Sequence, residues 1–340
     1  MEIGLSAGIA TEIRLENICF KEVIALQFVT FVHDGMRRVG VHKDGKIIDV
    51  RGALAARLRD GGEGHPRALA EALIPSDMRG LIERGEPAIA QVRSAVQYAL
   101  DRGEGGDPTE SRIVFGFSEV GIHAPILNPE KVIAVGLNYL DHAKESGMEP
   151  PKNPIFFSKY ASSIVGPGGA VVIPPADVTQ KVDYEVELAV VIGRAAKNVS
   201  VDEAMDYVFG YTIMNDVSAR DLQFEDGQWV KGKALDTFAP MGPWIVTKDE
   251  IPDPHNLRIV MALNGEVVQD SNTSQLIFKV PQLIAYFSRL FTLRPGDVIS
   301  TGTPPGVGMA RKPPRFLKPG DTMVAEIQGI GALQNPVVGS

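Results

Sequence analysis

The stretch Asp183-Tyr184-Glu185-Val186-Glu187 alternates acidic with aromatic or apolar side chains, and the apolar run 188–192 follows it directly. Successive side chains of a β-strand point to opposite faces, so the stretch predicts a strand with its three acids on one face. Like-charged groups about 7 Å apart repel one another unless water or a cation lies between them. A divalent metal ion and a solvated strand face both relieve that repulsion, and the stretch alone favours neither.

The composition of the chain is that of a globular protein whose partners are small molecules. Its 340 residues are 44% hydrophobic and 22% charged, enough for one large domain or two of ordinary size. A formal net charge of -8 disfavours nucleic acids and anionic membranes as partners. The single Cys19 excludes an intramolecular disulfide, and no apolar run reaches the roughly 20 residues of a membrane span. We therefore expect a cytoplasmic protein.

The chain divides into three predicted parts. Residues 1–27 are an N-terminal extension with four glutamates, which neither secretory nor mitochondrial signals favour. Residues 28–125 predict a small α+β domain, with strand-like runs up to residue 50, then two or three helices within 60–105 and a Gly-rich linker at 101–111. The turn pairs Asp34-Gly35 and Asp44-Gly45 separate the strands. Residues 126–340 alternate strand signals with Gly and Pro and predict a mainly β domain.

Local patterns place turns and helices within this larger domain. Asn138 is a candidate cap for a short helix, and Ser200 opens a capping-box pattern that predicts a helix ending at Gly210. Asn264-Gly265 predicts a hairpin turn. Pro281 suits the first turn of a helix with an apolar face.

Other polar residues suit catalysis, each with a plainer interpretation. Asp216 follows the apolar run 211–214, where sites are often built, although taken alone a helix cap is the better interpretation. Lys233 lies in a Gly-flanked turn and suits either a surface ion pair or an anionic substrate. His142 and Glu145 share one face if helical, which suits a general base or a weak surface contact.

The glycine-rich loop 301–308 follows a predicted strand. It lacks the Walker lysine and the dinucleotide fingerprint, so we do not expect a nucleotide there. Its hydroxyl and backbone N–H groups suit a carboxylate, and a structural turn is an equal alternative.

Five segments in this order resemble the fumarylacetoacetate hydrolase family, in particular its bacterial acylpyruvase and fumarylpyruvate hydrolase-like members, over residues 131–337. They are Gly136-Leu-Asn-Tyr-Leu-Asp-His142, Asp183-Tyr-Glu-Val-Glu187, Asn215-Asp-Val-Ser-Ala-Arg220-Asp221, Gly232-Lys-Ala-Leu-Asp236 and Thr301-Gly-Thr-Pro-Pro-Gly306. The resemblance implies a mainly β (α+β) fold with a mixed β-sandwich or β-roll catalytic domain, usually a homodimer. It also implies Mg²⁺, with Mn²⁺ or Ca²⁺ as alternatives.

The resemblance also implies a role for individual residues. Glu185, Glu187 and Asp216 would hold the metal, which leaves Asp183 as an acid that supports the site or lies at the surface. The catalytic residues implied are His142, Glu145 and Lys233, and the substrate contacts are Arg220, Gln223, Thr303 and Tyr139.

One position departs from the family pattern. Some members that act on small 2-oxo acids have arginine where this chain has Leu137. If that arginine holds a carboxylate, its absence argues against oxaloacetate or a simple acylpyruvate as the substrate.

The expected activity is hydrolysis of a carbon–carbon bond in a 1,3-dioxo compound, an acylpyruvate or diketo acid. His142, oriented by Glu145, takes a proton from water, and the metal with Lys233 stabilises the enolate that leaves. The alternatives are a decarboxylase, isomerase or hydratase of 2-oxo acids at the same site, and a metal-binding domain without turnover. The loops 150–157 and 224–229 are expected to line the pocket for the rest of the substrate.

Overall fold

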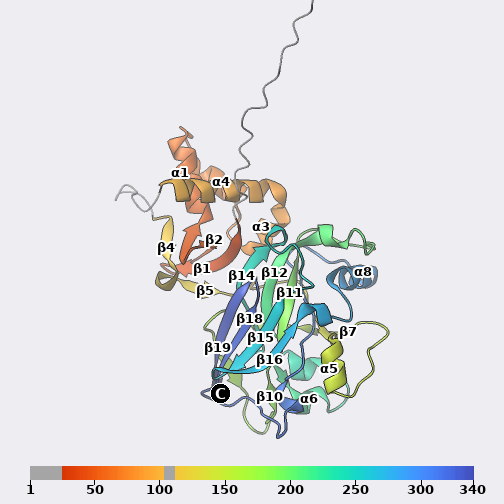
Figure 1. The fold of residues 1–340 in the computed structure, drawn as a ribbon. Coiled ribbons are helices and arrows are strands. Elements are labelled where there is room, and N and C mark those ends of the chain that lie inside the picture. Colours follow the sequence, from red (N-terminus) through yellow and green to blue (C-terminus); the bar gives the residue numbers. More distant parts are fainter. Residues whose placement is uncertain (1–24, 103–111) are drawn as a thin grey trace, which may run out of the picture.

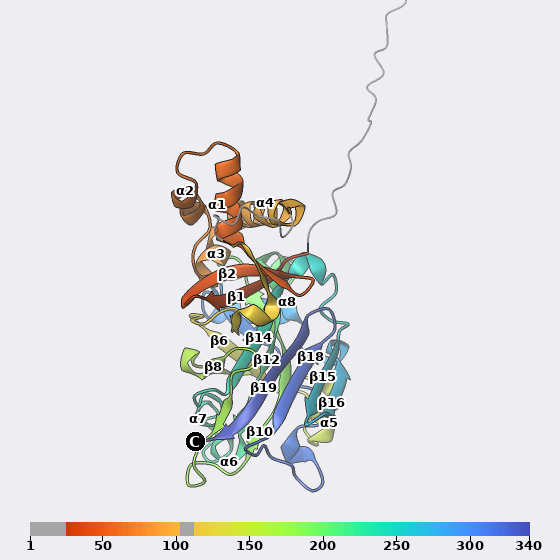
Figure 2. The same ribbon diagram turned by 90° about the vertical axis from the view of Figure 1, so that its left-hand side faces the viewer.

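The computed structural model describes residues 25–102 and 112–340, so most of the predicted extension and of the predicted linker lies outside the described residues. Figure 1 shows a helical N-terminal part above a β-rich body, and Figure 2 shows the same arrangement from the side. Among the helices of the described part, none combines the length and the apolar character that crossing a membrane requires.

The N-terminal part is a small antiparallel meander covered by helices. Its strands are β1 (Gln27–His33), β2 (Met36–Lys43), β3 (Lys46–Asp49), β4 (Val114–Gly116) and β5 (Gly121–His123). Its helices are α1 (Val50–Asp60), α2 (Pro66–Leu73), α3 (Met78–Arg84) and α4 (Glu86–Arg102). The prediction of a meander followed by helices is confirmed, but α1 begins directly after the third strand, earlier than predicted.

Both hairpin turns of the meander lie where the sequence predicted them. Asp34 and Gly35 have φ angles of +50° and +70°, and Asp44 and Gly45 have +49° and +75°. Two successive positive φ angles match the twist of antiparallel strands, which is why Asp-Gly pairs form such turns.

The second part contains most of the strands. They are β6 (Val132–Gly136), β7 (Ile155–Lys159), β8 (Ile164–Val165), β9 (Val171–Ile173), β10 (Val182–Asp183), β11 (Val186–Ile192), β12 (Val208–Asn215), β13 (Ser218–Ala219), β14 (Ala239–Thr247), β15 (Arg258–Leu263), β16 (Glu266–Asn272), β17 (Val298–Ser300), β18 (Thr322–Ile327) and β19 (Gly331–Gly339). Its α-helices are α5 (Leu140–Glu145), α6 (Arg220–Gln223), α7 (Val230–Lys233) and α8 (Val280–Leu290). The predicted hairpin at Asn264-Gly265 and the helix at Pro281 are confirmed.

Two sheets face each other in the β-rich body. The larger has 12 described strands, most in the order β4-β3-β2-β1-β14-β12-β11-β17-β6-β7, and the smaller has the order β16-β15-β18-β19-β9. Strands β15, β18 and β19 lie against β11, β12 and β14 (Figure 1). Parallel pairs, such as β17 with β6, occur among antiparallel ones. The predicted mainly β, mixed sandwich architecture is confirmed.

Strand β11 is buried on both faces, which is why its sequence is almost continuously apolar. Leu188 and Val190 belong to the core between the two sheets. Ala189 and Val191 belong to the core beneath the N-terminal helices. Strand β1 also pairs with β14, so one sheet runs across the boundary predicted at residues 125 and 126.

Gly210 of β12 has no room for a side chain. An added Cβ would lie 2.2 Å from the carbonyl oxygen of Val246 and 2.9 Å from a methyl carbon of Ile245. Gly210→Ala is therefore expected to lower the free energy of unfolding by about 1–3 kcal/mol, because the paired strands must move apart. Denaturant unfolding measures this, with Gly121→Ala as the control, since nothing lies within 4 Å of a Cβ there. Equal stability of the two variants would contradict the packing described.

The predicted helix over 200–210 is wrong. A short 3-10 turn (Ala204–Tyr207) takes its place, and β12 begins immediately afterwards. The capping-box contacts do form, since the Ser200 N–H donates to Glu203 Oε2 at 3.3 Å and the Glu203 N–H donates to Ser200 Oγ at 3.4 Å. The contacts stabilise a turn, and the residues that follow it pair in the sheet as β12.

Asn138 does not cap α5, contrary to the prediction. The residue before the helix is Tyr139, which makes no side-chain cap. The Asn138 amide instead donates to the carbonyl oxygen of Thr301 at 2.7 Å, and its oxygen accepts from the Phe278 N–H at 2.8 Å. Asn138 therefore joins three loops that lie far apart in the sequence.

Candidate active site and metal centre

Three buried carboxylates meet at the ends of β11 and β12. Glu185 precedes β11, Glu187 is its second residue, and Asp216 follows β12. Their exposed fractions are 6%, 1% and 1%. One carboxylate oxygen from each lies within 4.8 Å of the others. The structure thus brings together the three residues expected to hold a metal.

The stretch 183–187 is not one strand, so that prediction is wrong. Strand β10 ends at Asp183 and pairs with β13, whereas β11 begins at Val186 and pairs with β12. Between them the Glu185 N–H donates to the side-chain oxygen of Asn215 at 2.9 Å. The strand pairing changes here, from β13 to β12, and the two-residue periodicity of the sequence cannot reveal such a change.

Two lysines lie among these carboxylates. Lys233 Nζ donates to Glu185 Oε2 and to Asp216 Oδ2, each at 2.7 Å. Lys159 Nζ donates to Asp216 Oδ1 at 2.5 Å and to the carbonyl oxygen of Val217 at 3.2 Å. Asp216 is therefore held between two buried ammonium groups.

Sequence reasoning missed Lys159. It ends β7, where the buried side chains are Phe157 and Lys159. Residues at positions i and i+2 of a strand lie on the same face, so Lys159 shares a face with Phe157. A lysine on an apolar face is rare unless it is paired, and this alternation could have revealed it from the sequence. Burial lowers the pKa of Lys159, and the charge of Asp216 opposes this only in part.

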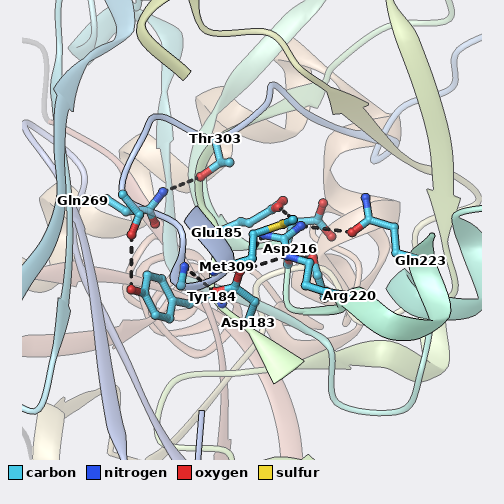
Figure 3. A network of polar contacts seen from close by, with 12 residues as sticks. Asp183, Tyr184, Glu185, Asp216, Arg220, Gln223, Gln269, Thr303 and Met309 are labelled. Atoms are coloured by element: carbon cyan, nitrogen blue, oxygen red, sulfur yellow. Dashed lines mark hydrogen bonds and ion pairs between the residues drawn. The ribbon is translucent and has the colours of Figure 1, made fainter. Parts of the chain in front are cut away.

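Asp183 is fully buried, so its interpretation as a surface acid is wrong and its supporting role remains. Arg220 Nε donates to Asp183 Oδ2 at 2.9 Å, and Arg220 Nη1 lies 2.6 Å from Glu185 Oε1. The same Nη1 donates to Gln223 Oε1 at 3.0 Å (Figure 3). Arg220 and Gln223, the expected substrate contacts, therefore lie beside the carboxylates and help to fix Glu185.

The glycine-rich loop binds carboxylates of the protein itself through its backbone. The Gly302 N–H donates to Glu187 Oε2 at 2.9 Å, and the hydroxyl of Ser300 donates to the same oxygen at 2.6 Å. The Gly306 N–H donates to Glu145 Oε1 at 3.0 Å. The loop thus fixes one acid of the cluster and one acid of the helix α5.

Helix α5 carries the expected pair of His142 and Glu145. His142 Nδ1 lies 3.0 Å from Glu145 Oε2, and the two side chains are 14% and 26% exposed. A carboxylate on Nδ1 orients the ring and leaves Nε2 to exchange a proton. Because the Gly306 N–H holds Glu145, the pair is positioned by the same loop as Glu187.

Tyr139 and Thr303, the other expected substrate contacts, differ in their surroundings. Tyr139 is fully buried, and its hydroxyl has no hydrogen-bond partner among the described residues. Burial, and then the charge of Glu187, raise its pKa well above the usual value. Thr303 Oγ1 donates to the Val186 carbonyl oxygen at 3.0 Å. It accepts from Gln269 Nε2 at 2.8 Å (Figure 3).

The charges of the cluster affect its acids unequally. Burial raises the pKa of Glu185, but Arg220 and Lys233 outweigh burial and lower it to about 2. Burial and the charges of Asp216 and Glu185 raise the pKa of Glu187 well above its usual value. Burial lowers the pKa of Lys233, but the two carboxylates that it contacts outweigh burial, and the pKa is raised. The two carboxylates thus favour the charged form of Lys233.

Glu187 is the acid that lacks a cation. The ion pairs of the described residues include Glu185 and Asp216 but not Glu187. A divalent ion among the three carboxylate oxygens would supply the missing positive charge, and hard divalent ions prefer such oxygens. The donor set therefore fits a divalent metal.

Aromatic rings line one side of the cluster. Lys233 Nζ lies 5.0 Å from the centre of the Phe157 ring. The Trp229 ring centre lies 5.7 Å from that of Phe157 and 6.2 Å from that of Phe224. A cavity of about 710 Å³ lies alongside, with Arg220 and Phe224 among its lining residues. The loop 224–229 thus reaches this cavity, and the loop 150–157 contributes no lining residue to it.

Gly136 packs directly under Trp229. A Cβ at Gly136 would lie 2.4 Å from Cζ3 of that ring. Gly136→Ala is therefore expected to displace Trp229 and to lower stability by about 1–3 kcal/mol. Tryptophan fluorescence in a Trp244→Phe background should shift to longer wavelength, because the ring becomes more exposed. An unchanged emission spectrum would show that the ring does not rest on this glycine.

The fold and the site belong to a known family. Residues 131–338 match the family described as Fumarylacetoacetate (FAA) hydrolase C-terminal. The chain is therefore a member of the fumarylacetoacetate hydrolase family, an enzyme family, as its five sequence segments predicted.

Similar proteins carry more than one activity in their names. Oxaloacetate tautomerase fahd2, mitochondrial, from Xenopus laevis is 48% identical over 290 residues, which cover 84% of this chain and 86% of that protein. Fumarylacetoacetate hydrolase from psychrophilic Exiguobacterium antarcticum has a TM-score of 0.73 at 36% identity, covering 93% of this chain and 100% of that chain. Maleylpyruvate hydrolase from Sphingobium sp. SYK-6, solved with manganese(II) and pyruvate, has a TM-score of 0.68 at 30% identity and the same coverage.

Proposed function

We propose that this chain is a magnesium-dependent tautomerase that interconverts the keto and enol forms of oxaloacetate. The observation that carries the proposal is the pairing of a fixed cation with a separate base. Lys233 is held between Glu185 and Asp216, and His142 is oriented by Glu145. The names of relatives that are about half identical support the substrate.

Tautomerisation moves one proton from carbon 3 to the carbonyl oxygen, and no other bond breaks. His142 takes the proton from carbon through Nε2 while Glu145 stabilises the charged ring. Lys233, whose pKa is raised, stays protonated and stabilises the negative charge on oxygen. His142 then donates the proton taken from carbon 3 to that oxygen, which gives the enol. A bound divalent ion would hold the 2-oxo carboxylate and polarise its carbonyl.

The charges of the site support an anionic substrate. Asp183 and the three carboxylates of the cluster are buried together with three cations, Lys159, Lys233 and Arg220. With all seven groups ionised the protein leaves one negative charge, and a divalent ion would change this to one positive charge. A substrate carboxylate then balances the site.

Leu137 remains an argument against oxaloacetate and against a simple acylpyruvate, because this residue offers no cation for a substrate carboxylate. Leu137 and the names of the relatives therefore point to different substrates. We follow the relatives, because their similarity covers most of the chain. KM values for oxaloacetate and acetopyruvate far above that for fumarylpyruvate would support the argument from Leu137.

Hydrolysis of an acylpyruvate is the second candidate. The pair of His142 and Glu145 suits activation of water, and one structural neighbour at 30% identity is a maleylpyruvate hydrolase. Decarboxylation needs an electron sink but no activated water, and it would release CO₂. Without turnover of any of these substrates, the chain would be a metal-binding domain.

The experiment is product analysis of the magnesium-loaded protein with oxaloacetate, acetopyruvate and fumarylpyruvate. Loss of the enol absorbance of oxaloacetate at constant total oxaloacetate supports tautomerisation. Pyruvate with a second carboxylic acid from an acylpyruvate supports hydrolysis instead, and pyruvate with CO₂ from oxaloacetate supports decarboxylation. Absence of enzyme-dependent change in the enol signal contradicts the proposal.

His142→Ala is expected to lower kcat for the reaction found by about 10²-fold or more, because general-base catalysis contributes that much. Metal binding should not change, since His142 is not among the three carboxylates of the cluster. Steady-state kinetics and a metal titration measure the two effects. Full activity of the variant on every substrate would remove His142 from the mechanism.

A homodimer in the cytoplasm is part of the same proposal. Strand β7 is the last strand of the large sheet, and its Ile155 and Phe156 are each 39% exposed. Tyr160, directly after it, is 57% exposed. An apolar sheet edge of this kind favours pairing with a second chain. Light scattering tests the dimer, and cell fractionation tests the compartment.

A further inference from the structure

A second cavity lies in the N-terminal part, at the end of the molecule away from α6 and β10 (Figures 1 and 2). Its volume is about 440 Å³. Strand β2 and helices α1 and α2 enclose it, together with residues 74–76 and 112–113. Such a volume suits a small organic molecule.

The cavity is lined by an unusual number of arginines. Within residues 25–102 and 112–340 no lysine lines it, and the lining acids are Asp49 and Glu71. The arginines are Arg37, Arg38, Arg51, Arg59, Arg67 and Arg112. The chain as a whole has a formal charge of -8, so this cluster of arginines is opposite in sign to the net charge of the protein.

Neighbouring carboxylates neutralise only some of these arginines. Arg38 Nη1 lies 2.8 Å from Asp49 Oδ2, which also caps α1. Arg112 pairs with Glu119, and Arg59 with Asp60. These contacts account for three of the six guanidinium groups.

The other three arginines have no carboxylate partner in the described part of the chain. Arg51 donates its Nε to the carbonyl oxygen of Ile74 at 3.1 Å, a neutral partner. Arg37 and Arg67 are exposed, and no described ion pair includes either of them. Three guanidinium groups without an ion pair among the described residues thus line one cavity, and Glu71 is the one lining acid there that is itself in no described ion pair.

The remaining wall is apolar. Val39, Ala55, Ala56, Ile74 and Pro75 line the cavity between the arginines. A ligand there would place anionic groups on the guanidinium groups and an uncharged body on this wall.

We propose that this cavity binds a small organic polyanion, a molecule with two or more phosphate or carboxylate groups on an apolar body. Arginine, rather than lysine, suits such ligands because its planar fork donates two parallel hydrogen bonds to one oxyanion. The site is distinct from the carboxylate cluster, which would repel the same ligand unless a metal were bound. The proposal does not depend on the reaction catalysed.

Calorimetric titration of the magnesium-loaded full chain tests the proposal. The probes are pyrophosphate, citrate and adenosine diphosphate. We expect one binding event, weakened by added salt, that the Arg37→Gln/Arg67→Gln double variant weakens about tenfold or more. Arg84→Gln, an exposed arginine outside the cavity, is the matched control and should bind as the wild type does.

The probes also identify the ligand chemistry. Preference for the diphosphates assigns the site to phosphates, and preference for citrate assigns it to carboxylates. Tighter binding of adenosine diphosphate than of pyrophosphate would show that the apolar wall contributes. Binding that is equal in the double variant and the wild type would place the anion elsewhere, at the metal for example, and would overturn the proposal. Absence of binding by all three probes at millimolar concentration would do the same.

Discussion

Glu187→Gln is expected to abolish stabilisation by divalent metal and to lower kcat/KM by about 10³-fold or more, because metal catalysis contributes several kcal/mol. Metal at 100 times its dissociation constant should stabilise the wild type by about 2.7 kcal/mol, and the variant should gain nothing. Glu187 has no cationic partner in the described structure. Its neutral isostere therefore leaves no buried charge unpaired.

The stability of the metal-free variant makes this test specific. Replacing Glu185 would remove one of the two carboxylate partners of Lys233 and of Arg220, so loss of metal and loss of stability would be confounded. For Glu187→Gln we expect metal-free stability at or above that of the wild type, because one buried negative charge is removed. Thermal unfolding with and without Mg²⁺ measures both quantities.

Asp183→Asn is the matched control for the loss of metal. Asp183 contacts Arg220 and the Gly308 N–H and lies outside the group of three carboxylates. This variant should retain metal binding, although it weakens a buried ion pair. A variant of Glu187 that still binds metal with wild-type affinity would remove this residue from the donor set, and a variant of Asp183 that loses the metal would extend the set.

Lys159→Met should destabilise the metal-free protein by about 3 kcal/mol, because removing one member of a buried ion pair leaves its partner uncompensated. Lys159 is 3% exposed and donates to Asp216 at 2.5 Å. Lys233 still contacts Asp216, which keeps the loss at the low end of the range for buried pairs. Saturating Mg²⁺ should recover part of the stability, since the ion supplies positive charge to the same carboxylate.

The control for this prediction is a lysine in an exposed ion pair. Lys231 contacts Glu225 and Asp226, and its side chain is 34% exposed. Lys231→Met should change stability by less than about 1 kcal/mol, because water screens such pairs. Urea unfolding of both variants measures the contrast. Equal losses of stability in the two variants would show that burial does not make the ion pair of Lys159 and Asp216 stronger than an exposed one.

Much of the site could be predicted because its residues carry local signals. Glu185, Glu187 and Asp216 lie in short motifs whose order along the chain matches one family, and the structure places them together. The same holds for His142 and Glu145, whose spacing of three on a helix suffices for contact. The Asp-Gly turns were predictable since a turn depends on its own residues.

What could not be predicted depends on contacts between distant segments. Lys159 and Asp216 are 57 residues apart in the sequence, and they meet only because the fold brings the end of β7 to the end of β12, although three strands separate β7 from β12 in the sheet. Asn138 looked like a helix cap, but its amide is used by loops more than 130 residues away. The helix predicted after Ser200 does not form, because the residues that follow pair as β12 with β14. Local propensity cannot predict pairing with a strand so far along the chain.

The pairing of β1 with β14 limits how the chain can be divided. Removing residues 1–125 at the boundary read from the sequence would strip β1 from β14 and leave Ile245 and Val246 on an open strand edge. It would also uncover Ala189 and Val191 of β11, the strand that holds Glu187. Such a fragment would expose unpaired backbone and an apolar face together, the combination that drives aggregation. The enzymatic part of this protein is therefore not expected to be a portable module, and truncated forms should fail to purify as monodisperse protein.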